Sequence, residues 1–338
     1  MTNQTMIDEV FLVGFPNLSS FRILIFIKIL GIYIMTLFVN VLIVVLVIFS
    51  KTLHFPMYFF ITQVSICDLL MTTDIVPKML SIILYEGSSM SFKSCIVQLY
   101  LFGVFVISEC FLLTVMSYDR YLAICSPLHY HSIMDSMLCL KLIILSWFLG
   151  FTLMLVTPIT TATLHFCGPD HIDHFFCDVA PLLELSCSDT SIVEIETVFL
   201  CGAIVLIPCI LVMISYIYIV HTIVRIPSIS GRQKAFSTCS SHLAVVSIYY
   251  GSLFCTYAIQ TKGKSAFLGK IMCLFYTVIT PFINPIIYTL RNKDIKEAVR
   301  KYGKILELWA RFTKCHFLPE EGPTSLRFNI TSNRFTVQ

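Results

Sequence analysis

Seven long apolar stretches constrain the fold of this chain more than any other feature. Each has the roughly 20 residues that a helix needs to cross the hydrocarbon core of a bilayer. Only 13% of the chain is charged and 57% is hydrophobic, a balance that excludes a water-soluble fold of this size. The stretches lie at about 25–49, 57–82, 96–122, 139–159, 195–220, 238–259 and 268–290. Because strands of a membrane barrel are about half as long, the sequence predicts an all-α membrane protein, a seven-transmembrane helix bundle.

The distribution of Lys and Arg predicts the orientation of this bundle. The connection 160–193 holds five acidic residues and no Lys or Arg. By contrast, Arg225, Arg232 and Lys234 lie between the fifth and sixth stretches, and ten more basic residues follow Leu290. Positive charge accumulates on the cytoplasmic side of a membrane, so the tail should be cytoplasmic and the N-terminus outside.

These signals predict three regions in a multi-pass protein of the plasma membrane. Residues 1–24 are an extracellular N-terminus, residues 25–290 are the transmembrane domain and residues 291–338 are a cytoplasmic tail. The first span is expected to serve as an uncleaved signal anchor. At 294–308 the spacing of acids, bases and apolar residues predicts an amphipathic helix on membrane lipids, followed by disorder. The basic residues are split among loops, so no nucleic-acid partner is expected.

Four of the fourteen cysteines lie outside the spans and on the predicted extracellular side. They are Cys95, Cys167, Cys177 and Cys187. An even set in an oxidising compartment can form disulfides with three possible pairings, and spacing alone leaves all three open. The other cysteines are interpreted as small apolar packing residues.

Two further signals concern the predicted extracellular segments. Asn3 begins an Asn-X-Thr acceptor for N-glycosylation. His174, Cys177 and Asp178 have donor atoms that suit a soft metal, although cysteines committed to disulfides are poor ligands. We expect a glycosylated N-terminus and no structural metal in the loop.

Six strings occur at fixed places along the seven-span frame. They are LHFPMYFF (53–60), PKML (77–80), MSYDRYLAIC (116–125), PLHY (127–130), KAFSTCSSHL (234–243) and PFINPIIYTLRN (281–292). In this order they resemble the odorant receptors, a branch of the rhodopsin-like G-protein-coupled receptors, over roughly residues 5–305. Two departures are Val39, where the family usually has Gly before the Asn of span one, and a longer tail.

The resemblance implies a receptor rather than an enzyme. It implies binding of a small, mostly apolar odorant in the outer half of the bundle and activation of a heterotrimeric G protein of the stimulatory, olfactory type, which raises cAMP. It also implies that Cys95 bonds Cys177 and that Cys167 bonds Cys187. No HExxH, Gly-rich phosphate loop or nucleophile elbow argues for an enzyme.

Ionisable residues inside a bilayer are costly and therefore mark function. The resemblance places Asp68 of span two opposite Glu109 of span three. Two carboxylates in a dry site cannot both stay ionised without help, and the resemblance favours Na⁺ between them. A shared proton, or separate hydrogen-bond partners for each acid, are the alternatives. Asp74 lies about 9 Å further along span two on another face, and no role is assigned to it.

The cytoplasmic ends of the spans carry the expected G-protein switch. Arg120 follows Glu109 by eleven residues, about three helical turns, so the two lie on nearly the same face. Asp119 is expected to hold the guanidinium at rest, and movement of the sixth span would release it. The remaining switch residues are expected to be Tyr216, Asn284, Pro285 and Tyr288.

An odorant site needs apolar walls with few polar anchors. The outer halves of spans three, five, six and seven supply such walls at helical spacing. The candidate ligand-binding residues are Phe102, Gly103, Val106, Ile107, Leu200, Ile204, Tyr250, Leu253, Tyr257 and Thr277. The tyrosines are favoured because a buried hydroxyl needs a partner.

The alternatives to an odorant receptor are a non-olfactory receptor of the same superfamily and a transporter or channel. An amine receptor should have an acid near Phe102, and a retinal protein should have a Lys deeper in span seven than Lys270. A transporter or channel should show inverted repeats, broken helices or rings of pore charges, and the sequence shows none.

Overall fold

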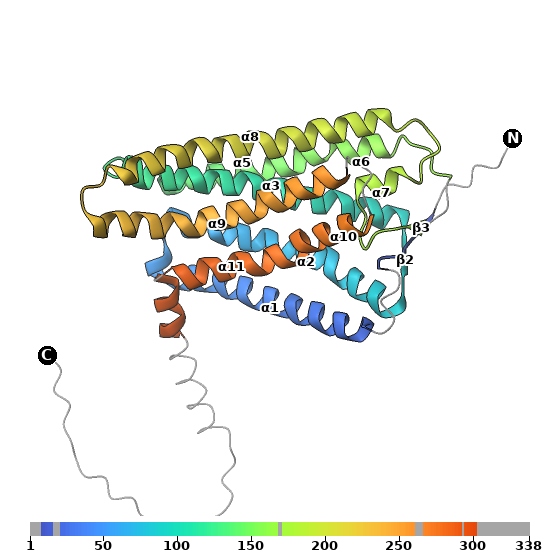
Figure 1. Cartoon of the computed structure of the whole chain (residues 1–338), viewed down its shortest axis with the longest axis horizontal. Coiled ribbons are helices and arrows are strands. Elements are labelled where there is room, and N and C mark those ends of the chain that lie inside the picture. Colours follow the sequence, from blue (N-terminus) through green and yellow to red (C-terminus); the bar gives the residue numbers. More distant parts are fainter. Residues whose placement is uncertain (1–7, 16–20, 168–170, 261–265, 293, 303–338) are drawn as a thin grey trace, which may run out of the picture. The chain divides into compact units, whose positions relative to one another are not determined.

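The computed structural model describes residues 8–15, 21–167, 171–260, 266–292 and 294–302. The fold is a bundle of seven membrane-length helical segments within the unit Met1–Ala298 (Figure 1). Six of the segments are formed by α1 (Arg22–Phe49), α2 (Pro56–Tyr85), α3 (Phe92–Cys125), α5 and α6 (Ser136–Met154 and Val156–Thr161), α8 (Ser191–Val224) and α9 (Ile229–Gln260). The seventh consists of α10 (Ala266–Leu274), a π-helical turn η2 (Phe275–Ile279) and α11 (Thr280–Arg291).

All seven predicted apolar stretches lie within these helices, so the predicted bundle is confirmed. Among the described residues, six helical segments are long and apolar enough to cross a membrane. The remaining segment, α9, is equally long but contains many Ser and Thr residues, including those of the KAFSTCSSHL string. Its hydroxyl groups can hydrogen-bond to the helix itself, as Thr256 does to the carbonyl of Ser252 at 2.9 Å.

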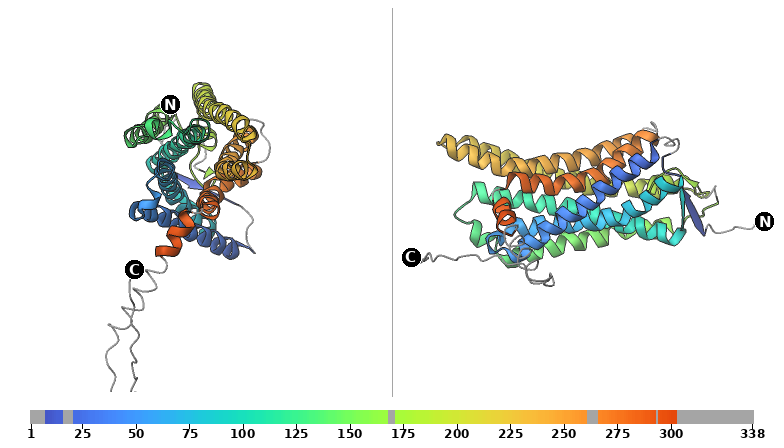
Figure 2. Two further views of the ribbon diagram at one scale, coloured as in Figure 1. Left: turned by 90° about the vertical axis from the view of Figure 1, so that its left-hand side faces the viewer. Right: turned by 90° about the horizontal axis from the view of Figure 1, so that it is seen from below.

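The third span is the central helix of the bundle. It contacts α2, α5, α6, α8 and α9, and the view along the helices shows them grouped around it (Figure 2). Around almost its whole circumference, α3 therefore contacts protein rather than lipid. As a result, the residues from Phe102 to Cys110 are all buried.

A three-stranded sheet in the order β2-β1-β3 closes one end of the bundle, and the sequence did not predict it. Strand β1 (Glu9–Leu12) pairs antiparallel with β2 (Ser88–Ser91), with Leu12 opposite Ser88. It pairs parallel with β3 (His171–Ile172). Val10 and Leu12 alternate inward and are fully buried. We call the end of the bundle that this sheet closes the sheet end.

Local sequence explains how the chain turns from α2 into β2. Glu86 adopts a left-handed conformation with φ of 61°, and Gly87 follows with φ of 139°. A residue with a Cβ is strained at the second angle, so glycine suits this turn. At the start of α3, the Ser91 hydroxyl caps the helix by accepting from the amide of Ser94 at 3.2 Å.

The remaining short elements lie in the connections. They are η1 (Lys51–Leu53), α4 (Tyr130–Ile133) and α7 (Val179–Leu183). In Figure 1, α6, α7 and β3 lie at the same end of the helices. Residues 294–302 are helical, as predicted for the start of the amphipathic helix, and Ile295 and Ala298 are buried there. Predictions for 303–338 and for Asn3 lie outside the described residues.

Candidate functional site

A buried polar cluster lies in the middle of the bundle. Asn284 Nδ2 is 3.4 Å from both carboxylate oxygens of Asp68 and 3.2 Å from Glu109 Oε1. All three side chains are fully or almost fully buried. Among the described residues, Glu109 Oε2 and Asn284 Oδ1 have no hydrogen-bond partner. The structure thus brings Asn284, predicted as a switch residue, between the two predicted ion-site carboxylates.

At the end of the bundle opposite the sheet, which we call the Arg120 end, Arg120 pairs with its neighbour Asp119. Its Nε donates to Asp119 Oδ2 at 3.0 Å, and its Nη2 contacts the same oxygen. Tyr130 of the short helix α4 donates to Asp119 Oδ1 at 2.7 Å. This carboxylate is fully buried, so charge-assisted hydrogen bonds from both sides compensate its charge.

A cavity of about 760 Å³ opens at this end. Arg120, His242 and Tyr288 are among its lining residues, and they come from α3, α9 and α11. Tyr216 O–H lies 2.8 Å from His242 Nδ1 and donates to the Cys239 carbonyl at 3.2 Å, which ties α8 to α9. The hydroxyl of Tyr288 is buried and has no partner in the part of the chain that the structure describes.

Two residues of the Arg120 end were not predicted from the sequence. His242 belongs to the KAFSTCSSHL string, and the spacing of residues in this string does not indicate the hydrogen bond to Tyr216. Tyr58 donates to Asp294 Oδ2 at 2.8 Å and to Asn292 Oδ1 at 3.1 Å, which joins α2 to the segment after span seven. Pro285, also predicted for the switch, lies inside α11 next to Asn284.

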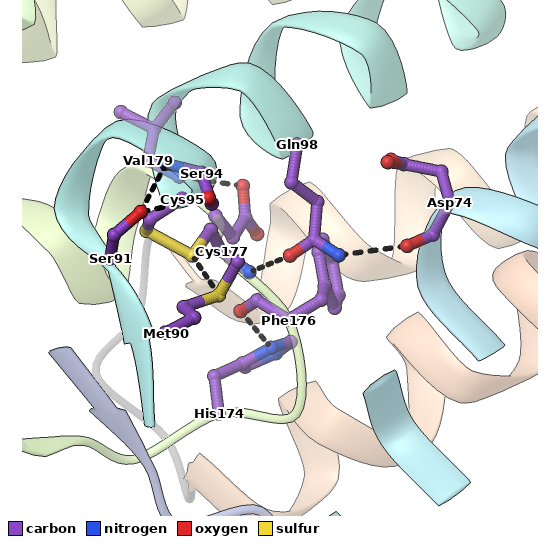
Figure 3. Close-up of a disulfide and its surroundings, with 11 residues drawn as sticks. Asp74, Met90, Ser91, Ser94, Cys95, Gln98, His174, Phe176, Cys177 and Val179 are labelled. Carbon is purple, nitrogen blue, oxygen red and sulfur yellow. Dashed lines mark hydrogen bonds between the residues drawn. A yellow bond between two sulfur atoms is a disulfide. The ribbon is translucent and has the colours of Figure 1, made fainter. Parts of the chain in front are cut away.

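Disulfides fasten the loop between α6 and α8 at the sheet end. Cys95 is bonded to Cys177, and Cys167 is bonded to Cys187, the two pairings that the family resemblance implies. Gln98 of α3 reinforces the first bridge (Figure 3). Its Oε1 accepts from the Cys177 amide at 3.0 Å, and its Nε2 donates to the Asp74 carbonyl at 2.9 Å.

The same loop inserts aromatic side chains into the bundle. Phe175 and Phe176 are fully buried, and the ring centroid of Phe176 lies 5.1 Å from that of Phe102. Phe102 also contacts Tyr276 of the π-helical turn at 5.7 Å. Through these contacts the loop between α6 and α8 covers the half of the bundle in which a ligand site is predicted. We call this loop the lid.

His174 is the buried titratable residue of this lid. Its Nδ1 is 3.2 Å from the Phe176 carbonyl, and its ring stacks on Phe175. Burial lowers the pKa of the His174 imidazole from 6.5 to about 4, although the nearby Asp178 favours the charged form. The histidine is therefore neutral at physiological pH. Because Cys177 is in a disulfide, its sulfur is not available as a metal ligand.

The predicted ligand-binding residues of α3 separate into two directions. Phe102 faces the lid, and Val106 and Ile107 are buried further along the helix. Gly103 faces α5 instead, because a Cβ at this position would meet the side chain of Met154. Gly103 therefore has a packing role between α3 and α5.

The tyrosines of α9 use their hydroxyls on the backbone of α3. Tyr250 O–H donates to the Cys110 carbonyl at 3.0 Å, and Tyr249, which was not predicted, donates to the Val106 carbonyl at 2.8 Å. These bonds leave no hydroxyl proton of either tyrosine for a ligand in this conformation. Leu253 is buried on the same helix, whereas the side chain of Tyr257 lies outside the described residues.

The remaining candidates come from spans five and seven. Ile204 is buried and Leu200 is half-buried on one face of α8. Thr277 is buried in the π-helical turn, where its hydroxyl donates to the Cys273 carbonyl at 2.7 Å. A second cavity of about 590 Å³ lies at the sheet end, lined by Asp74, Lys78 and Gln98 among others. Neither this cavity nor the one at Arg120 is lined by the predicted ligand-binding residues.

A membrane bundle of seven helices, with a disulfide-anchored lid at one end and a buried Asp-Arg pair above a cavity at the other, defines a receptor of the G-protein-coupled class. A family model described as "Olfactory receptor" matches residues 29–305. The chain is 44% identical to human olfactory receptor 11L1 over 300 residues, which cover 88% of this chain and 93% of that protein. It is 45% identical to human olfactory receptor 6F1 over 303 residues, 89% of this chain and 98% of that protein.

Mouse olfactory receptor 5G26 is 42% identical over 303 residues, 89% of this chain and 95% of that protein. The chain therefore belongs to the olfactory receptor family. Members of this family are receptors and not enzymes, which agrees with the prediction from the sequence.

Proposed function

We propose that this chain is an odorant receptor of the plasma membrane. It binds a small, mostly apolar molecule in the half of the bundle next to the lid. It then activates a heterotrimeric G protein of the stimulatory, olfactory type at the Arg120 end and so raises cAMP. In this proposal the sheet end is extracellular and the Arg120 end is cytoplasmic, because Lys and Arg gather in the connections at the latter end.

The position of Arg120 is the observation that carries the proposal. Its guanidinium is buried, pairs with Asp119 and lies in the wall of a cavity at the end of the bundle. A guanidinium presents several donors in a fixed plane, so it suits recognition of a partner's backbone carbonyls or carboxylates. Displacement of α9, which also lines the cavity, would widen it enough to admit a segment of the G protein.

The proposed ligand site draws its affinity from apolar burial. Phe102, Val106, Ile204 and Leu253 come from α3, α8 and α9, and all are buried. Burial of a hydrocarbon ligand contributes roughly 0.8 kcal/mol for each CH₂ group, so a small odorant needs most of its surface covered. The lid residues next to Phe102 supply this cover.

We further propose that Asp68, Glu109 and Asn284 hold a sodium ion. The residues fit a small cation because two acids share one amide donor, while Glu109 Oε2 and Asn284 Oδ1 are buried without partners. When bound, the cation supplies positive charge that keeps the three side chains together. Replacing NaCl by choline chloride should lower the melting temperature of the purified receptor, and Asp68→Asn should abolish the difference. Equal melting temperatures of the wild type in both salts would favour a shared proton.

Replacement of Arg120 tests the signalling proposal. Cells with a cAMP reporter are screened with volatile and water-soluble compounds, and Arg120→Ala is compared with Arg22→Ala, an arginine at the sheet end. Surface expression of each variant is measured with an N-terminal tag, which also reports the orientation. We expect Arg120→Ala to abolish the response and Arg22→Ala to retain it. A normal dose response from Arg120→Ala would refute the switch, and ligand-dependent current through purified protein would favour a channel.

A further inference from the structure

A carboxylate in span five has no role in the sequence analysis or in the function proposed above. Glu196 lies in the second turn of α8, about 8 Å from its first residue at ~1.5 Å per residue. Its Oε1 accepts a hydrogen bond from the hydroxyl of Thr157 in α6 at 3.2 Å. Its Oε2 is buried and finds no hydrogen-bond partner among the residues that the structure describes.

Glu196 lies on the same face of α8 as the candidate ligand-binding residues. Leu200 and Ile204 follow it at intervals of four residues, so the three side chains form one stripe. Val193, three residues before Glu196, and Ile204 are both buried. Phe199, three residues after Glu196, is 74% exposed, so Glu196 lies at the boundary between the buried stripe and the lipid-facing side of α8. The hydrogen bond with Thr157 directs its carboxylate toward α6.

A positive group next to Glu196 Oε2 would satisfy this buried oxygen. Thr157 offers only a neutral hydrogen bond, and within the described part of the chain no Lys or Arg forms an ion pair with Glu196. Lys270, which contacts the loop between α6 and α8, is committed to Asp173 and to the Gly14 carbonyl.

The surroundings favour a cation over a neutral donor. The loop that leads to this end of α8 has several acids and no Lys or Arg between Thr160 and Val193, so its potential attracts cations. The Thr161 hydroxyl, one turn after Thr157 on α6, is also buried and has no partner within the described ranges. It can accept one hydrogen bond from an ammonium group whose charge Glu196 balances.

We propose that Glu196 is the polar anchor of the ligand site and that it selects small apolar molecules carrying a protonated amine. The inference rests on the ligand site proposed above and names the chemical class of its ligand. The ammonium group binds Glu196 Oε2, and the hydrocarbon body extends along Leu200 and Ile204 toward the centre of the bundle. The amine thus occupies the region between α6 and α8, and the apolar body contacts the stripe already assigned to the ligand.

The experiment compares n-alkylamines from butyl to decyl with the alcohols of equal length. Potency is measured in cAMP-reporter cells for the wild type, Glu196→Gln, Glu196→Asp and Glu194→Gln. Glu194 is the matched control, because it is exposed and bonds Thr190 at the start of α8. In the wild type, at least one amine should be about tenfold or more potent than its alcohol, since the charge pair forms in a desolvated site.

Glu196→Gln should abolish this preference, Glu196→Asp should retain part of it and Glu194→Gln should leave it unchanged. Equal amine potency in the wild type and Glu196→Gln would overturn the inference, as would alcohols that activate while no amine does. Melting temperatures of the purified variants with the same compounds separate the two proposals. If amines stabilise the wild type and not Glu196→Gln but no compound raises cAMP, the binding inference stands and the signalling function is wrong. If amines neither stabilise nor activate, the inference fails.

Discussion

Lys270 offers the most direct test of how the lid is held. It is a buried lysine of α10, and its ammonium group donates to the Gly14 carbonyl at 2.7 Å and pairs with Asp173. Its two partners are 256 and 97 residues away in the sequence. One side chain therefore joins the N-terminal strand, the disulfide-bonded loop and span seven. Lys270→Met removes the charge and the donors while it keeps most of the side-chain volume.

The expected magnitude follows from the two contacts. A charged donor to a buried carbonyl contributes roughly 1.5–3 kcal/mol, whereas the ion pair contributes below about 1 kcal/mol because the Asp173 side chain is 55% exposed. The methionine recovers part of this loss through apolar packing. A net loss of about 2 kcal/mol for opening of the lid corresponds to roughly 30-fold faster local opening.

Hydrogen exchange measured by mass spectrometry detects this opening directly. The reporting amides are those of Val13, which donates to the Ile172 carbonyl at 3.0 Å, and Gly14, which donates to the His174 carbonyl at 3.1 Å. Lys93→Met is the control, since Lys93 is exposed on α3 at the same end of the bundle. Unchanged exchange in peptides from the first strand of Lys270→Met would refute the reasoning. Equal acceleration over the whole chain would show a global loss of stability instead of a local one.

Two further predictions concern the lid and the switch. The pKa of His174 is lowered by burial to about 4, so the unfolded lid binds more protons than the folded lid below about pH 6.5, and stability is lost as the pH falls. Between about pH 7.5 and 5 the loss should be roughly 2 kcal/mol, visible as faster exchange in the loop and absent in His174→Gln. Tyr216→Phe removes the bonds to His242 and the Cys239 carbonyl, so ligand-independent cAMP should rise, roughly fivefold for each ~1 kcal/mol lost by the resting state. Basal cAMP equal to or below that of the wild type would contradict this account of the α8 to α9 contact.

The spans could be predicted from the sequence because their signal is local. About twenty consecutive apolar residues suffice, and neither 25–49 nor 195–220 needs information from the rest of the chain. The disulfide partners needed more, since three pairings of the four cysteines are compatible with their spacing. Resemblance to a family supplied that information, as it did for the opposition of Asp68 and Glu109.

The sheet could not be predicted in the same way. Glu9–Leu12 is too short for its alternation to stand out, and its partner strands begin at Ser88 and His171. Its stability comes from pairing across the chain and from contacts such as that of Lys270 with Gly14. The buried position of Glu196 Oε2 could not be predicted for a similar reason. From the sequence alone, an acid near the end of an apolar stretch is interpreted as a solvated residue. Only the position of the partner helix shows which face is buried.

The predicted ligand-binding residues of α3 show where helical periodicity stops being informative. Neighbouring residues on a helix point about 100° apart, so Phe102 and Gly103 meet different neighbours, the lid and α5. On a surface helix, the change from buried to exposed positions would have separated these two directions. On a central helix it cannot, because every position from Phe102 to Cys110 is buried. A stripe at i, i+1, i+4 and i+5 therefore identifies buried residues in α3 without identifying what each one contacts. What each residue contacts must be found from its partners in three dimensions, as the contact of Phe102 with Phe176 shows.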